Sequence, residues 1–165
     1  MSGASGADTE VLDGILDMYD AFMARDRARF DSHLDADVTT WESPLPRIMT
    51  RSELDRYRDE RPPAVVAAVL ELRVEPERID VWGDHALARY LFVAVRTGGS
   101  VETSRVTDVL RRGADGRWLI VHHHSELWAA DVPAQTEAEA EAEAEAVVAV
   151  APATGAAPAA AEARA

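Results

Sequence analysis

Four long runs rich in β-branched and aromatic residues dominate the second half of the chain. They cover residues 70–82, 85–97, 100–112 and 117–128, and the turn signals GD, GG and GADG separate them. Such punctuation predicts an antiparallel meander. Because each run is longer than an ordinary strand, we expect a curved sheet that contains bulges.

The residues before the meander follow a helical period instead. Apolar side chains recur every three or four positions over 10–24, with Thr9 as the expected N-cap, and a short second helix is expected over 27–34. The segment DVTTWESP predicts a strand, and residues 52–61 predict a third helix that ends before two prolines. Helices followed by a meander indicate an α+β fold.

Composition divides the chain into three parts. Residues 1–8 are small and polar, and we expect a disordered leader. Residues 9–131 form the expected single domain, and at 47% hydrophobic residues the chain can bury a core. The Glu/Ala-rich tail over 132–165 has little to bury and is expected to be disordered, with an acidic docking role as the alternative.

Charge and targeting signals exclude several function classes. The formal net charge is −13, and the arginines are dispersed among carboxylates, so nucleic acid and anionic membranes are not expected partners. The chain has no cysteine, which excludes thiolate catalysis and disulfides. No signal peptide or membrane span is visible, and we expect a cytoplasmic protein.

Strand alternation sorts the last hairpin into two faces. If the chain turns about the centre of RRGADGRW, Asp108 pairs with Val121 and Val106 pairs with His123. One face is then mostly apolar with a few polar groups, as in a ligand cavity, although a packed core face is the alternative. Its members are Ser104, Val106, Asp108, Leu110, Leu119, Val121, His123 and Ser125. A one-residue bulge would exchange the two faces beyond it.

The other two histidines of the HHH triplet point away from this face. His122 and His124 could supply nitrogens to a metal with Glu126, but no second histidine cluster exists, and we expect no metal site. With Arg105 and Trp118 they form a mixed face suited to a homodimer through the sheet.

Three segments carry a family resemblance over residues 9–128. They are YDAFMARDRARFDSHLDADVTTWESP, MTRSELDRYRD and SRVTDVLRRGADGRWLIVHHHSELW. They resemble the SnoaL-like and ketosteroid-isomerase-like superfamily, whose α+β cone wraps a curved antiparallel sheet around an N-terminal helical layer. This superfamily hosts isomerases, dehydratases, cyclases, epoxide hydrolases and non-catalytic binders, so the resemblance implies a fold more than a reaction.

The resemblance also assigns roles to residues. Glu42 falls where ketosteroid isomerases hold their general-base aspartate, and Asp108 falls where they hold a protonated acid that donates to the enolate. The oxyanion-hole tyrosine falls on Met18, with Tyr19 one position away. His123 and Ser125 are absent from the isomerase pattern and could replace that donor.

These residues predict a small enzyme without a cofactor. Glu42, Asp108, His123 and Ser125 are the expected catalytic residues, for isomerisation, cyclisation or dehydration of a polyketide-like or other cyclic carbonyl substrate. The candidate substrate contacts are Tyr19, Trp41, Tyr90, Val106 and Val121. For Tyr90 a plain sheet position is the alternative, and Trp41 and Trp82 are expected to pack the core, with the cavity mouth as the alternative for Trp41.

Two alternatives compete with this function. WLIVHHHSE resembles the W-x-I-V-H-H-H-S-S signature of iota-class carbonic anhydrases, relatives of the calcium/calmodulin-dependent kinase association domain. That resemblance also implies a site lined by His123 and Ser125. A non-catalytic ligand-binding or association module is the second alternative, and it predicts a filled core without a cavity.

Overall fold

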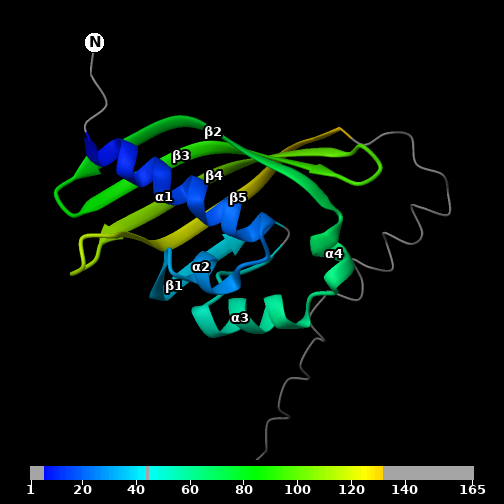
Figure 1. Ribbon diagram of the computed structural model, residues 1–165, viewed down its shortest axis with the longest axis horizontal. Coiled ribbons are helices and arrows are strands. Elements are labelled where there is room, and N and C mark those ends of the chain that lie inside the picture. Colours follow the sequence, from blue (N-terminus) through cyan, green and yellow to red (C-terminus); the bar gives the residue numbers. More distant parts are fainter. Residues whose placement is uncertain (1–5, 44, 132–165) are drawn as a thin grey trace, which may run out of the picture. The chain divides into compact units, whose positions relative to one another are not determined.

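Four helices and five strands make up the described part of the chain, residues 6–43 and 45–131 of a computed structural model (Figure 1). The long helix α1 (Gly6–Met23) buries Val11, Ile15, Met18 and Ala21, which lie on one face because they recur every three or four residues. This helix begins before Thr9, so the expected N-cap is wrong, and residues 6–8, which were expected in the leader, are helical. The predicted tail lies outside the described residues.

The sheet is five-stranded, with the order β1-β5-β4-β3-β2. Strands β2 (Val69–Trp82), β3 (His85–Arg96), β4 (Val101–Arg112) and β5 (Trp118–Asp131) form the expected antiparallel meander. Strand β1 (Leu34–Glu42) pairs with β5 in parallel, so the sheet is mixed and not wholly antiparallel. The α+β class and the curved sheet are confirmed.

Three short helices follow the long one, and the second of them contacts β1. Helix α2 (Arg27–Asp31) is capped by the Asp26 side chain, which accepts a hydrogen bond from the Arg29 amide. Helix α3 (Arg51–Glu60) begins with a capping box between Thr50 and Glu53. Helix α4 (Pro63–Ala67) starts at a proline, which suits the first helical position because its missing amide proton would have no partner there.

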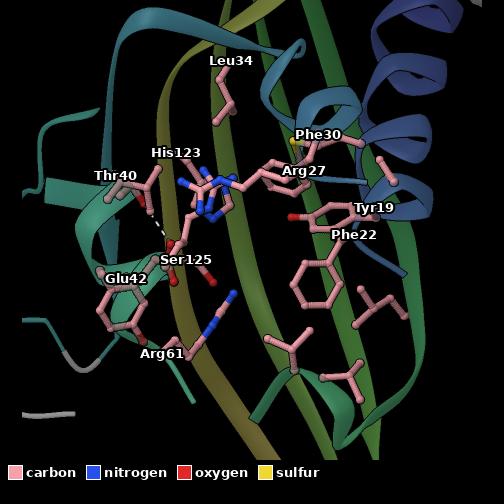
Figure 2. A pocket seen from close by; sticks show the side chains of 18 of the residues that line it. Tyr19, Phe22, Arg27, Phe30, Leu34, Thr40, Glu42, Arg61, His123 and Ser125 are labelled. Atoms are coloured by element: carbon pink, nitrogen blue, oxygen red, sulfur yellow. Dashed lines mark hydrogen bonds between the residues drawn. The ribbon is translucent and has the colours of Figure 1, made fainter. Parts of the chain in front are cut away.

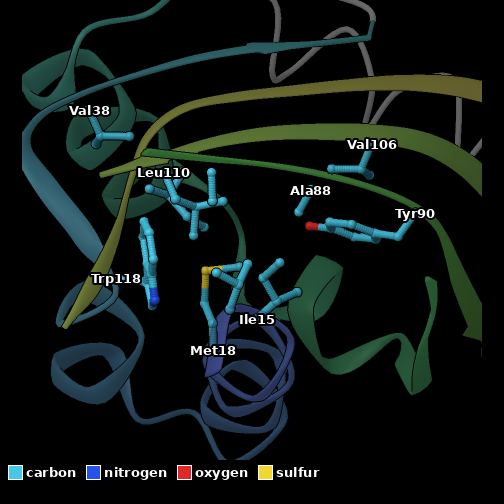
Figure 3. Close-up of a cluster of buried hydrophobic side chains, with 11 residues drawn as sticks. Ile15, Met18, Val38, Ala88, Tyr90, Val106, Leu110 and Trp118 are labelled. Atoms are coloured by element: carbon cyan, nitrogen blue, oxygen red, sulfur yellow. The ribbon is translucent and has the colours of Figure 1, made fainter. Parts of the chain in front are cut away.

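The core lies between α1 and the inner face of the sheet (Figure 3). Ile15 and Met18 of α1 meet Ala88, Leu110 and other buried side chains of the strands. Two predicted core residues lie elsewhere: Trp82 is 59% exposed and Trp41 is 43% exposed. Both were expected in the core because aromatic residues favour burial, but each lies at or near the end of an edge strand.

The β4–β5 hairpin differs from the predicted pairing. Asp108 lies opposite His123 and Val106 lies opposite Ser125, a shift of two residues that keeps the same faces together. The pairing then jumps by one at Val121, which is left over as a bulge. For residues 118–120, which precede the bulge, the two faces of the strand are therefore exchanged relative to the prediction.

This exchange corrects four predicted positions. Trp118 and Ile120 are buried on the inner face, whereas Leu119 and Val121 are half-buried. Trp118 therefore cannot belong to the outer face that was expected to form a dimer. Above the bulge, His123 and Ser125 keep their predicted side.

No helix within the described residues is long and apolar enough to cross a membrane.

Candidate functional site

A pocket of about 450 Å³ opens between the helices and the inner face of the sheet. All four helices and strands β1, β2, β3 and β5 contribute to its wall, and most of the lining side chains are apolar, among them Phe22, Phe30, Leu34, Phe92 and Ile120. Ligand pockets in proteins have this size and character. The filled core that an association module predicts is therefore not found.

Polar side chains gather where β1 and β5 lie side by side (Figure 2). The parallel pairing places Thr40 beside His123 and Glu42 beside Ser125. All four line the pocket, because residues two apart on a strand share a face. The Thr40 hydroxyl donates a hydrogen bond to Glu42 Oε1 at 3.1 Å.

A buried carboxylate lies behind this polar end. Asp108 is fully buried, and His123 Nδ1 lies 2.7 Å from its Oδ1. The Tyr90 hydroxyl donates to Asp108 Oδ2 at 2.7 Å. Because the Tyr90 hydroxyl proton is engaged by Asp108, the Tyr90 oxygen accepts a hydrogen bond from the Tyr19 hydroxyl, 3.0 Å away. A hydrogen-bonded chain thus runs from Tyr19 to His123, and both of its ends line the pocket.

The charge of Asp108 sets the protonation of this chain. Burial alone would lower the pKa of His123, but the Asp108 charge, the hydrogen bond to Asp108 and the Glu42 charge outweigh burial and raise it. Burial and the Asp108 charge raise the pKa of both Tyr19 and Tyr90, so both stay phenols at neutral pH. The raised pKa favours the imidazolium form of His123 more than in a free histidine, and the Nδ1 proton is directed at Asp108.

The predicted catalytic residues fall into two groups. Glu42, His123 and Ser125 converge on the pocket. Asp108 was expected in the cavity as a donor to the substrate, but it does not line the pocket, and both of its oxygens are engaged by Tyr90 and His123. Its position behind His123 suits orientation of the imidazole.

The predicted substrate contacts divide in the same way. Tyr19 lines the pocket. Tyr90 and Val106 are buried beneath the wall, and Val121 is the bulged residue outside it. Trp41 lies away from the pocket, where its ring stacks on His124 with centroids 5.6 Å apart.

Sequence reasoning missed two kinds of lining residue. Phe22 and Phe30 carried an apolar signal, but helical periodicity cannot separate a residue that packs from one that lines a cavity. Arg61 directly follows α3 and precedes two prolines. No local pattern indicates that its side chain lines the pocket.

Metal-binding geometry is not found within residues 6–43 and 45–131, where no group of three or more His, Asp or Glu side chains could hold an ion. His122 instead lies 2.8 Å from the Thr39 hydroxyl through its Nδ1.

Comparisons with solved structures agree on the fold. A putative ketosteroid isomerase from Shewanella frigidimarina is 24% identical over 73% of this chain and 97% of its own, with a TM-score of 0.57. The CaMKII hub of S. rosetta is 20% identical over 76% of this chain and 100% of its own, with a TM-score of 0.64. A ketosteroid isomerase-like protein from Erwinia carotovora is 15% identical over 74% and 96%, with a TM-score of 0.59.

A comparison with curated proteins gives no match. The model of the SnoaL-like domain matches residues 15–123, which include the pocket residues Glu42 and His123 and end before Ser125. The chain belongs to the SnoaL-like domain family.

Proposed function

We propose that this protein is a cofactor-independent enzyme that moves protons on an organic carbonyl compound. The observation that carries the proposal is that Glu42 and His123 both line the polar end of an apolar pocket, with buried Asp108 behind His123. Two titratable groups in one pocket can serve as base and acid. The reaction class is isomerisation, cyclisation or dehydration, and a polyketide-like or other cyclic ketone fits the pocket volume.

The chemistry divides between two side chains. The Glu42 carboxylate removes a proton from the carbon beside the carbonyl, while imidazolium His123 donates to the carbonyl oxygen as negative charge develops there. The resulting enol is reprotonated by Glu42 at the same carbon or at a conjugated one, and its O–H proton returns to His123, which restores the imidazolium. The Ser125 hydroxyl lines the same wall and supplies a further donor.

Deuterium exchange tests the proposal before the natural substrate is known. We expect the wild type to accelerate exchange of the α-protons of bicyclic aromatic ketones in D₂O, as followed by NMR. Glu42→Gln should lower this rate by at least about tenfold, because an amide cannot accept the proton. His122→Gln is the matched control, since His122 lies outside the pocket, and it should retain the rate.

Equal exchange by the wild type and Glu42→Gln would contradict the proposal.

Carbon dioxide hydration is the second candidate, because His123 and Ser125, which the carbonic anhydrase resemblance implies, line this pocket. A stopped-flow indicator assay separates the two. The volume of about 450 Å³ and the apolar wall favour the larger organic substrate.

We also propose a homodimer through the outer face of the sheet. Trp128 is 58% exposed and lies beside Arg105, which leaves a large aromatic surface open in the single chain. Light scattering should give a dimer for the wild type and a monomer for Trp128→Glu. Trp82→Glu, at an exposed tryptophan of the edge strand β2, should remain a dimer. A monomeric wild type would contradict the proposal.

A further inference from the structure

Arg61 is a charged residue of the pocket wall that the proposed acid/base chemistry does not use. It follows the last residue of α3 with an extended backbone (φ −66°, ψ 128°), as expected of a residue before proline. Its side chain lines the pocket, and its guanidinium lies 6.0 Å from the Phe22 ring centre and 5.9 Å from that of Tyr57. Figure 2 shows it reaching in from the end away from Leu34.

The pocket wall is rich in arginine although the chain is acidic. Among its lining residues five arginines stand against two carboxylates, whereas the whole chain has 30 acidic and 17 basic residues. The arginines are Arg25, Arg27, Arg58, Arg61 and Arg96.

Most of these arginines are already neutralised. Arg27 and Arg58 form ion pairs with aspartates outside the pocket, and Arg96 pairs with Glu102 at 3.1 Å. Arg25 is exposed. Arg61 has no ion pair with any carboxylate of the described residues, although it is half-buried.

Arg61 also has an unused donor. Its Nε is buried and has no hydrogen-bond acceptor within the part of the chain that the structure describes. A buried N–H without an acceptor is unfavourable, and an anion would supply the acceptor. Burial lowers the pKa of Arg61, yet an arginine side chain stays protonated in proteins, so the charge is present for a ligand.

We propose that Arg61 binds a carboxylate of the substrate, so that the substrate class is an organic carbonyl compound that also carries a carboxylate. A planar guanidinium matches a carboxylate with two parallel hydrogen bonds, and the aromatic rings beside it exclude water. One unpaired guanidinium suits a single negative charge. This inference rests on the proposed function, in which His123 and Glu42 act at the polar end of the same pocket.

An unreactive probe tests the binding step alone. We expect 4-phenylbutyrate to bind the wild type more tightly than its neutral amide, 4-phenylbutanamide, in isothermal titration calorimetry. Arg61→Gln should weaken 4-phenylbutyrate binding by about tenfold or more, because a charge-assisted hydrogen bond is lost. Arg61→Lys keeps the charge but lacks the planar guanidinium. Its affinity for 4-phenylbutyrate should therefore lie between those of the wild type and Arg61→Gln.

Two controls separate recognition from folding. Arg56→Gln removes the same charge from an exposed site of α3 outside the pocket and should leave the affinity unchanged. Binding of 4-phenylbutanamide should be equal in the wild type and Arg61→Gln if the pocket is intact. The inference would be overturned if Arg61→Gln lost affinity for both ligands equally. It would also be overturned if the wild type did not bind 4-phenylbutyrate, or bound it no more tightly than 4-phenylbutanamide.

The result is independent of the chemistry. 4-Phenylbutyrate has no ketone, so its binding requires no proton transfer by Glu42 or His123. A protein that binds the probe through Arg61 but exchanges no α-proton would retain the inferred anion site and refute the proposed enzyme.

Discussion

Replacing His123 by glutamine is expected to lower the exchange rate by about 10²- to 10⁴-fold, the range typical of a lost general acid. Glutamine keeps a polar side chain of similar size but cannot transfer a proton. The loss should be larger than in Glu42→Gln, because no other titratable group that lines the pocket is hydrogen-bonded to a buried carboxylate. His124→Gln, on the outer face, is the matched control and should retain the rate.

The pH profile gives a second readout. Because the pKa of His123 is raised above 6.5, the imidazolium that donates to the carbonyl persists toward neutral pH and is lost as the pH rises through the raised value. The wild-type rate should therefore fall on this alkaline limb, and His123→Gln should lack the limb. An unchanged rate or an unchanged limb in His123→Gln would show that His123 is not the acid.

The predictable part of the fold came from local patterns. Turn signals delimited the four meander strands closely, and the apolar period over 10–24 located the helix α1, which buries Val11, Ile15 and Met18. These features depend on neighbours in the sequence. Such local patterns were sufficient to predict the α+β class and the position of His123 on the inner face of the sheet.

Long-range pairing limited the prediction of the site. The bulge at Val121 exchanged the faces of Trp118 and Ile120, and a bulge has no sequence signal in this strand. The parallel contact of β1 with β5 put Thr40 beside His123, but β1 is far from β5 in sequence. Strand alternation alone could not reveal that Asp108 would lie behind His123.

Replacing Asp108 by asparagine is expected to lower the pKa of His123. The Asp108 charge and hydrogen bond hold that pKa above 6.5 against burial, and without them burial should bring it below 6.5. NMR titration of the histidine ring protons measures the change, with His124 as an internal reference. Glu77→Gln removes an equal charge from an exposed site of β2 and should leave the His123 titration unchanged. An unshifted His123 in Asp108→Asn would contradict the role of the pair.

Asp108→Asn should also destabilise the protein by about 3–5 kcal/mol, because breaking a buried ion pair leaves its partners unsatisfied. The asparagine amide would face donors from Tyr90 and His123 with only one acceptor oxygen. A raised folded-state pKa stabilises fully below 6.5, and this stabilisation is lost as the pH rises through the raised value. Urea unfolding should therefore show the largest difference from the wild type on the acidic side of that interval. A difference that does not shrink with rising pH would mean that Asp108 stabilises the fold without charging His123.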